Sequence, residues 1–302
     1  MSSPALSTTC KIALCQIAVG SDKAANIRRA QEAIADAVGR GKTMAGSTAP
    51  LDMVVLPEVW NSPYATSSFP VYAEQVPSVG AAITGLSDAM SSTKMLLEVA
   101  KKLGVWIVGG SIPEKGENGK LYNTCLVIDS SGKIAAKHRK VHLFDIDVPG
   151  RVTFKESDSL TAGNEVTTFS SPWGNVGVGI CYDIRFPEYA MLLRQKGCRL
   201  LVYPGAFNMV TGPAHWELLQ RARAVDNQLF VAACSPARNA SSGYVAWGHS
   251  SVVNPWGEVV AKAGYEDETI FATLDFGLAD TMRENIPCWK QKRSDIYELK
   301  EK

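Results

Sequence analysis

Several features that would place a protein in a familiar class are missing from this sequence. Its seven cysteines form no CxxC pair, and its four histidines lack the spacing of a zinc set such as HExxH. We therefore expect neither a disulfide framework nor a metal site, and nothing in the sequence implies a cofactor. A reducing compartment is the natural location for such a chain, namely the cytoplasm, with or without a mitochondrial pool.

Long apolar runs and an excess of charge of one sign are missing as well. No apolar run reaches the roughly 18 residues that a membrane helix needs. The first ten residues contain neither the charged stretch nor the apolar stretch of a secretory signal. The 31 lysines and arginines almost cancel the 30 acidic residues, so we do not expect binding to nucleic acid or to a membrane surface.

What remains is the composition of an ordinary globular protein. Hydrophobic residues make up 46% of the chain and charged residues 20%. A length of 302 residues is long for one domain but common among α/β domains. No linker or change in composition divides the chain, so residues 1–302 are predicted to form one domain, with residues 1–10 as an N-terminal extension.

Short apolar runs alternate with helical patterns along the whole chain. In the segment 21–40, Asp22 suits the N-cap of a helix, and Ala30, Ile34 and Val38 recur on one helical face. A Gly/Ser/Pro-containing loop follows at 41–50. Strands are predicted at 11–20, 52–59, 105–110, 176–183, 199–207, 229–237, 248–255 and 257–264, a hairpin at 122–140, and further helices at 91–103, 188–197 and 212–228. The simplest architecture that buries so many apolar strands is a layered α/β sandwich.

Three of the predicted strands end at a residue that can take part in catalysis. Glu58 follows the run VVLP, Cys181 follows GVGI, and Lys140 ends the second strand of the hairpin. In α/β folds, loops at the carboxyl ends of strands commonly form the binding crevice. Each residue alone has an ordinary explanation, because a lone cysteine after an apolar strand is often a small core residue.

The segments around these three residues carry a resemblance. VVLPEVWNSPY (54–64), KHRKVHLFD (137–145) and GICYDIRFPE (179–188) resemble, in order and spacing, the three signature motifs of the nitrilase, or carbon–nitrogen hydrolase, superfamily. The resemblance extends from about residue 11 to about residue 298. Three motifs in the same order are far more specific than one short pattern. The resemblance implies a four-layer α-β-β-α sandwich and a Glu-Lys-Cys catalytic triad.

The resemblance assigns a role to each member of the triad, and the chemistry of amide hydrolysis agrees. Cys181 would be the nucleophile, and because a free thiol has a pKa of about 8.5 it needs a base or a nearby cation. Glu58 would be that base. Lys140, with the backbone N–H of Tyr182, would hold the oxyanion. Glu156 matches a second glutamate of the family, which would orient Lys140 or contact the amide; the alternative is a surface glutamate in a charged loop.

Other stretches resemble one branch of the superfamily, the omega-amidases. They are HLFDIDVPGRVTF (142–154), VYPGAFNMVTGPAHWELLQRARAVDNQ (202–228), SPARN (235–239), YVAWGHSSVVNPWGEV (244–259) and QKRSDIY (291–297). This resemblance implies hydrolysis of the terminal amide of dicarboxylic acid monoamides, such as alpha-ketoglutaramate, alpha-ketosuccinamate and succinamate. The alternatives are a deaminated-glutathione amidase, an N-carbamoyl amidohydrolase, a true nitrilase or, outside catalysis, a silent interaction protein.

The distal carboxylate of such a substrate calls for a cation or for several hydrogen-bond donors. Arg185 lies four residues after Cys181 and is one candidate, although an ion pair with Glu188 would equally explain it. Tyr64, Thr211 and His215 are further candidates, which we expect to rim the pocket. The superfamily resemblance also implies a homodimer. The segment YAMLLRQKG has an apolar side that is broad for a solvent-facing helix, so we expect the helix at 188–197 to form part of the interface.

Overall fold

The computed structural model describes residues 6–41 and 50–302. Most of the loop predicted at 41–50 and the first five residues of the predicted extension therefore lie outside the described residues. Thr9 and Cys10, which the predicted boundary assigned to the extension, already belong to the first strand and pair with Asp275 and Leu274.

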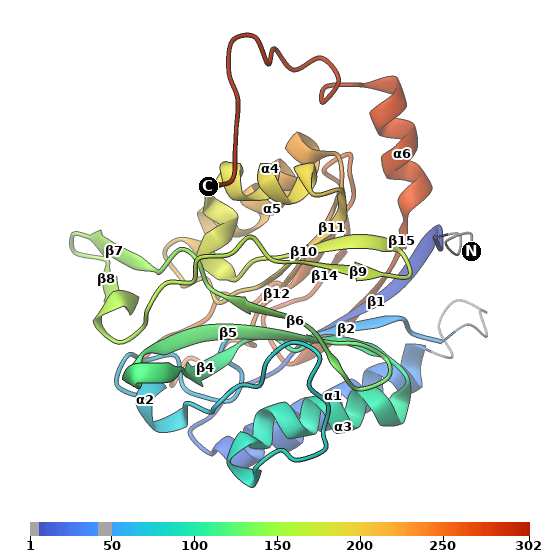
Figure 1. Ribbon diagram of the computed structural model, residues 1–302. Helices are drawn as coiled ribbons and strands as arrows, with labels where there is room; N and C mark the ends of the chain where they lie inside the picture. The colour runs from blue at the N-terminus through green and yellow to red at the C-terminus, as the bar shows by residue number, and fades with distance from the viewer. Residues whose placement is uncertain (1–5, 42–49) are drawn as a thin grey trace.

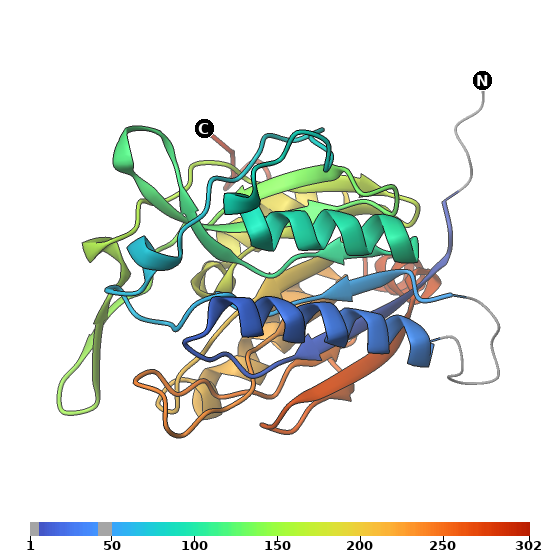
Figure 2. The ribbon, with the colours of Figure 1, turned by 90° about the horizontal axis from the view of Figure 1, so that it is seen from below.

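One sheet has seven strands in the order β15-β1-β2-β3-β5-β4, with β6 paired to β5. The neighbours β1, β2 and β3 are parallel, whereas β15, β4 and β6 each run antiparallel to their partner. Figure 2 shows two long helices, α1 (Lys23–Gly41) and α3 (Ser91–Leu103), lying across one face of this sheet. The strands are β1 (Thr9–Gln16), β2 (Met53–Val55), β3 (Trp106–Val108), β4 (Ile112–Lys115), β5 (Leu121–Ile128), β6 (Ile134–Arg139) and β15 (Glu268–Asp275).

The other sheet has six strands in the order β14-β13-β12-β11-β10-β9, of which β10, β11 and β12 are parallel. Helices α4 (Pro187–Gln195) and α5 (Gly212–Asn227) cover its outer face, so the molecule has four layers, α-β-β-α (Figure 1). The predicted sandwich is confirmed. The strands are β9 (Thr168–Ser171), β10 (Gly174–Val178), β11 (Cys198–Pro204), β12 (Phe230–Cys234), β13 (Ser251–Val253) and β14 (Val259–Lys262).

The alternation of side chains along β1 explains how the layers hold together. Ile12 and Leu14 point into the core between the two sheets, whereas Ala13 and Cys15 belong to the second core, beneath α1 and α3. Both faces of this strand are therefore buried, as its nearly continuous apolar sequence predicts. Cys15, Cys125 and Cys234, predicted as core residues, are all fully buried.

Several elements outside the two sheets complete the chain. The helix α6 (Phe276–Asn285) follows β15, and a two-stranded hairpin of β7 (Asp145–Val148) and β8 (Val152–Lys155) projects from the body of the molecule (Figure 1). Short helical segments are α2 (Phe69–Tyr72), η2 (Asp88–Met90), η3 (Glu117–Gly119), η4 (Glu156–Asp158) and η5 (Cys181–Arg185). Within residues 6–41 and 50–302, no helix is long and apolar enough to cross a membrane.

Candidate active site

Glu58, Lys140 and Cys181 come together from both sheets. Glu58 follows β2 and Lys140 follows β6 in the seven-stranded sheet, whereas Cys181 follows β10 in the six-stranded sheet. All three side chains are buried between the sheets, at the carboxyl ends of their strands. The position of these residues at strand ends, read from the sequence, thus corresponds to their place in the fold.

A buried ion cluster forms the centre of the site. The Lys140 ammonium lies 2.8 Å from Glu58 Oε1 and 2.9 Å from Glu156 Oε2. The three side chains are completely buried, so solvent does not screen their charges. Glu156 Oε2 also accepts a 2.7 Å hydrogen bond from the backbone N–H of Phe144. The surface location that was the alternative for Glu156 is wrong, because this carboxylate directly contacts Lys140.

The two carboxylates keep the lysine charged. Burial alone would lower the pKa of Lys140, but Glu156 and Glu58 outweigh it, and the pKa lies well above its ordinary value. For Glu58, burial raises the pKa and Lys140 counteracts part of the increase. Glu58 Oε2 accepts a 2.8 Å hydrogen bond from the backbone N–H of Ala206. The arrangement can therefore hold a fixed positive charge beside a carboxylate that is more basic than usual.

Cys181 occupies an unusual backbone conformation. Its φ is +46°, a left-handed region that costs a non-glycine residue free energy and that is found at many functional turns. It begins η5, so the strand predicted at 176–183 ends earlier, at Val178. The backbone of Gly205 packs against it: a Cβ at Gly205 would lie 3.2 Å from the Cys181 Cα.

The thiol of Cys181 is a protonated group at rest. Burial is the main reason why its pKa is well above the ordinary value, and the Glu58 carboxylate raises the pKa further, whereas Lys140 lowers it. Hydrogen bonding with the Glu58 side chain also contributes to the raised pKa of the thiol, and hydrogen bonding with the backbone of Ala206 lowers that pKa. Glu58 is thus a neighbour of the thiol whose proton it would have to accept.

Two more side chains belong to this cluster. The hydroxyl of Tyr64, predicted to bind substrate, lies 3.3 Å from one oxygen each of Glu58 and Glu156 and 3.4 Å from the Lys140 ammonium. Asn123, which the sequence reasoning missed, donates a 2.9 Å hydrogen bond to Glu58 Oε1. The available signal was the pair of polar residues, Asn123 and Thr124, inside the otherwise apolar strand β5.

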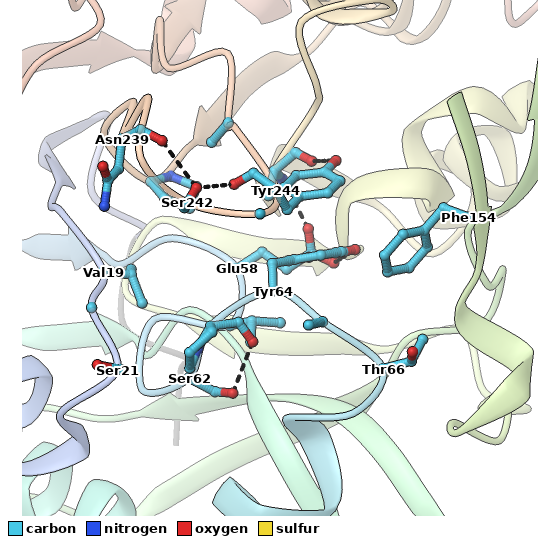
Figure 3. A pocket seen from close by; sticks show the side chains of 18 of the residues that line it. Val19, Ser21, Glu58, Ser62, Tyr64, Thr66, Phe154, Asn239, Ser242 and Tyr244 are labelled. Atoms are coloured by element: carbon cyan, nitrogen blue, oxygen red, sulfur yellow. Dashed lines mark hydrogen bonds between the residues drawn. The ribbon is translucent and has the colours of Figure 1, made fainter. Parts of the chain in front are cut away.

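A cavity of about 580 Å³ opens beside this cluster. Glu58 and Tyr64 are among its lining residues, and Figure 3 shows Tyr64 next to Tyr244. Their rings are stacked with centroids 4.4 Å apart, and Phe154 of β8 contacts both. Ser62, Asn239 and Ser242 add neutral polar groups to the wall. The cavity therefore combines apolar surface with a few hydrogen-bonding groups, as small-molecule sites commonly do.

The other predicted substrate-binding residues lie outside the lining of this cavity. Arg185 Nη1 is 3.2 Å from Nδ1 of His215, and its guanidinium packs over the Phe207 ring at 4.6 Å. Its partner is thus His215 rather than the exposed Glu188, and its Nε is buried without a partner. Thr211 precedes α5 and donates hydrogen bonds to Asn208 Oδ1 from its backbone N–H and its hydroxyl. Their predicted contact with substrate stays a prediction.

The histidines, cysteines and carboxylates of residues 6–41 and 50–302 do not gather into a metal centre. In the part of the chain that the structure describes, no group of three or more such residues could hold a metal ion. His138 and His142 both contact Asp183, a single carboxylate.

Comparison with known proteins identifies the family. The carbon–nitrogen hydrolase family model matches residues 11–284, which is most of the chain. The chain belongs to the carbon–nitrogen hydrolase family. It is therefore similar in sequence to enzymes that hydrolyse carbon–nitrogen bonds. The family membership that the three motifs predicted is confirmed.

Individual members of the carbon–nitrogen hydrolase family match over nearly the full chain. The Arabidopsis thaliana protein named Omega-amidase, chloroplastic, is 52% identical over 292 residues, which are 97% of this chain and 74% of that one. The human protein named Omega-amidase NIT2 is 50% identical over 295 residues, 98% of this chain and 99% of that one. The solved structure of Saccharomyces cerevisiae Nit3, of the nitrilase superfamily, has a TM-score of 0.84 and 43% identity, and covers 97% of this chain and 100% of its own.

Proposed function

We propose that this chain is an omega-amidase. It hydrolyses the terminal amide of dicarboxylic acid monoamides, such as alpha-ketoglutaramate, alpha-ketosuccinamate and succinamate, to the diacid and ammonia. Proteins named omega-amidase in a plant and in human are about half identical to it over nearly its whole length, which supports this substrate class. The chemistry is supported by one observation above all: a buried lysine held charged between Glu58 and Glu156, beside the Cys181 thiol.

The first half of the proposed reaction transfers the acyl group to the enzyme. Glu58 accepts the thiol proton of Cys181 as the sulfur attacks the amide carbon. The Lys140 ammonium and the backbone N–H of Tyr182 stabilise the negative charge that develops on the amide oxygen. The protonated Glu58 then donates its proton to the leaving nitrogen, and ammonia departs. The acyl group remains on Cys181 as a thioester.

The second half returns the enzyme to its starting state. Glu58, again a carboxylate, accepts a proton from water, and the resulting hydroxide attacks the thioester carbon. The same cation and backbone N–H stabilise the second oxyanion. The carbon–sulfur bond breaks, the diacid leaves, and the sulfur takes back its proton. Glu156 acts in both halves by keeping Lys140 charged and oriented, and no metal or cofactor enters the scheme.

A panel of substrates tests the proposed activity. Ammonia release from alpha-ketoglutaramate and succinamate is measured beside deaminated glutathione, an N-carbamoyl amino acid and an aliphatic nitrile. The highest kcat/KM should fall on the dicarboxylic acid monoamides. A higher kcat/KM on any other arm would refute the omega-amidase assignment while leaving the thioester mechanism to be tested by itself. Failure of every arm would favour the non-catalytic alternative.

We also propose a homodimer, formed through the layer of α4 and α5. Apolar side chains are exposed on and beside this layer, with Leu218 62%, Val225 44% and Trp256 47% exposed. The C-terminal segment reaches the same region, where Glu301 pairs with Lys196 at 2.6 Å. Sedimentation equilibrium at micromolar concentration should give twice the chain mass, and a Val225→Glu variant should dissociate. A monomeric wild type would contradict the proposal.

The cytoplasmic location stays a prediction.

A further inference from the structure

Asp183 is a buried ionisable group that the proposed mechanism does not use. It lies two residues after Cys181, within η5, and its side chain is completely buried. A buried carboxylate is costly unless each of its oxygens is paired or hydrogen bonded. The hydrogen-bond partners of the Asp183 carboxylate therefore indicate which structural role this buried charge has.

Both oxygens of Asp183 are fully engaged. Oδ2 accepts a hydrogen bond from the backbone N–H of Ile180 at 2.8 Å and lies 3.2 Å from Nε2 of His138. Oδ1 accepts one from the backbone N–H of His142 at 2.9 Å and lies 2.8 Å from Nδ1 of the same residue. His138 continues the network to the Thr167 hydroxyl, at 2.9 Å.

These contacts connect the two segments that carry the reacting groups. Ile180 immediately precedes Cys181, and His142 lies two residues after Lys140. The first segment extends from the six-stranded sheet and the second from the seven-stranded sheet. A single carboxylate therefore bonds to both segments across the interface between the sheets. Oδ2 contacts Ile180 and also His138 of β6, and Oδ1 contacts His142. The ring of His142 also stacks on Phe186, with centroids 3.6 Å apart, which adds a second contact between the segments.

The charge of Asp183 suits this arrangement. Burial by itself would raise its pKa, but the hydrogen bonds with His138 and His142 and the N–H of Ile180 more than compensate, and the pKa lies well below its ordinary value. The group therefore remains an anion that only accepts hydrogen bonds. The strained left-handed backbone of Cys181 needs such support, because residues in this region persist only where their surroundings hold them.

We propose that Asp183 is a positioning residue, whose carboxylate fixes the Cys181 turn relative to the segment that carries Lys140. This inference rests on the proposed function, in which Cys181 attacks while Lys140 holds the oxyanion. A displacement of about 1 Å between such groups can cost on the order of 10²-fold in rate. Asp183 thus acts on the rate through two other residues and does not touch the substrate.

The substitution Asp183→Asn tests this geometry with almost no change in shape. Backbone N–H groups can only donate, and one faces each oxygen of Asp183, from Ile180 and from His142. An asparagine has one oxygen and one NH₂ group. In either orientation of the amide, one backbone N–H therefore faces another donor, and one of the two backbone hydrogen bonds to this side chain is lost.

The measurements are kcat and KM for succinamate, and the rate at which iodoacetamide alkylates Cys181, followed by peptide mapping. In Asp183→Asn, kcat should fall about 10²-fold with little change in KM, and alkylation should slow. His142→Phe keeps the stacking on Phe186 and the backbone N–H, but loses the ring nitrogen, so kcat should fall by a smaller factor. The matched control is Asp52→Asn, because Asp52 also accepts a backbone hydrogen bond, from Lys11 at 2.7 Å, but lies outside the site.

Circular dichroism and Tm separate positioning from folding. A folded Asp183→Asn variant with wild-type kcat and alkylation rate would overturn the proposal, as would a loss no greater than that of Asp52→Asn. If Asp183→Asn does not fold, His142→Phe decides: reduced kcat at constant KM supports positioning, and unchanged kcat refutes it. Cys181→Ala, assayed in parallel, tests the proposed function by itself, since turnover in that variant would refute the nucleophile whatever the Asp183 result.

Discussion

The Lys140 ammonium lies 2.8 Å from Glu58 Oε1, and both side chains are completely buried. A pair of this kind is seldom retained for stability alone, because removing two charges from water costs as much as their attraction returns. Here Glu156 provides a second carboxylate, 2.9 Å from the same ammonium, so the cluster holds two negative charges and one positive charge. The excess carboxylate explains why the pKa of Lys140 is raised despite burial. Burial, together with the charge of Glu156, raises the pKa of Glu58, so this carboxylate is basic enough to accept a proton.

Removal of the lysine should therefore damage catalysis severely. Lys140→Ala should lose at least about 10²-fold in kcat, through the missing oxyanion charge. Lys140→Arg should not restore activity, because a planar guanidinium cannot replace a compact ammonium between two carboxylates. The control is Lys262→Ala, since Lys262 pairs with Glu217 on the surface. Near wild-type activity in Lys140→Arg would show that Lys140 is not at the reacting centre.

The pH dependence follows from the directions of the pKa shifts. Glu58 acts as a base only when ionised, and its pKa is raised, so kcat/KM should fall toward acid with a midpoint above the ordinary glutamate value of about 4.3. The pKa values of Cys181 and Lys140 are raised as well, so neither group loses its proton near neutrality. No alkaline decrease is expected below about pH 8.5, the pKa of an ordinary thiol. A profile that declines between neutrality and that pH would contradict this electrostatic account.

Arg185 provides a test of substrate selectivity. If its guanidinium binds the distal carboxylate, Arg185→Met should lose about 10–150-fold in kcat/KM on succinamate, which corresponds to roughly 1.5–3 kcal/mol. A neutral short-chain amide of similar length should lose much less. Equal losses on both would mean that Arg185 supports the Cys181 turn instead, through its contact with His215 and the hydrogen bond from Arg223 to its backbone carbonyl.

Gly110 supports the turn that carries Glu58, and its replacement should lower stability. Its φ is +62°, and a Cβ there would lie 2.2 Å from the carbonyl oxygen of Pro57 and 2.7 Å from the Trp60 ring. Gly110→Ala should therefore cost more than about 2 kcal/mol in the free energy of unfolding. Gly104 is the control, because its φ is +66° but no atom lies within 4 Å, so Gly104→Ala should cost only about 1 kcal/mol. Equal changes in urea unfolding would contradict the role of close packing.

Local patterns predicted much of the fold. The helix predicted at 91–103 has those bounds in the structure, and Asp22 does accept a hydrogen bond at the start of α1, from Ala25. The hairpin predicted at 122–140 forms, with Asp129 hydrogen bonded inside its turn. In these segments the periodicity of burial and the turn chemistry agree with each other, so short-range information is sufficient.

One of the elements that were missed depends on a distant partner. The edge strand β15 has a mixed pattern of burial, and it is fixed by pairing with β1 from the other end of the chain. At the site, Glu58, Lys140 and Cys181 could be found because each belongs to a recognisable motif. Asn123 and Asp183 could not be assigned a role, because a polar residue in an apolar segment does not reveal which residue it contacts across two sheets.

The most direct test of the account is the identity of the residue that carries the acyl group. The enzyme is mixed with succinamate, quenched within the turnover time and digested, and the peptides are analysed by mass spectrometry. We expect an acyl adduct on the peptide that contains Cys181, and no turnover in Cys181→Ala despite a normal circular dichroism spectrum. Replacement of the exposed Cys288 by serine should leave both adduct and activity intact. An adduct on another residue, or full activity in Cys181→Ala, would contradict the proposed mechanism.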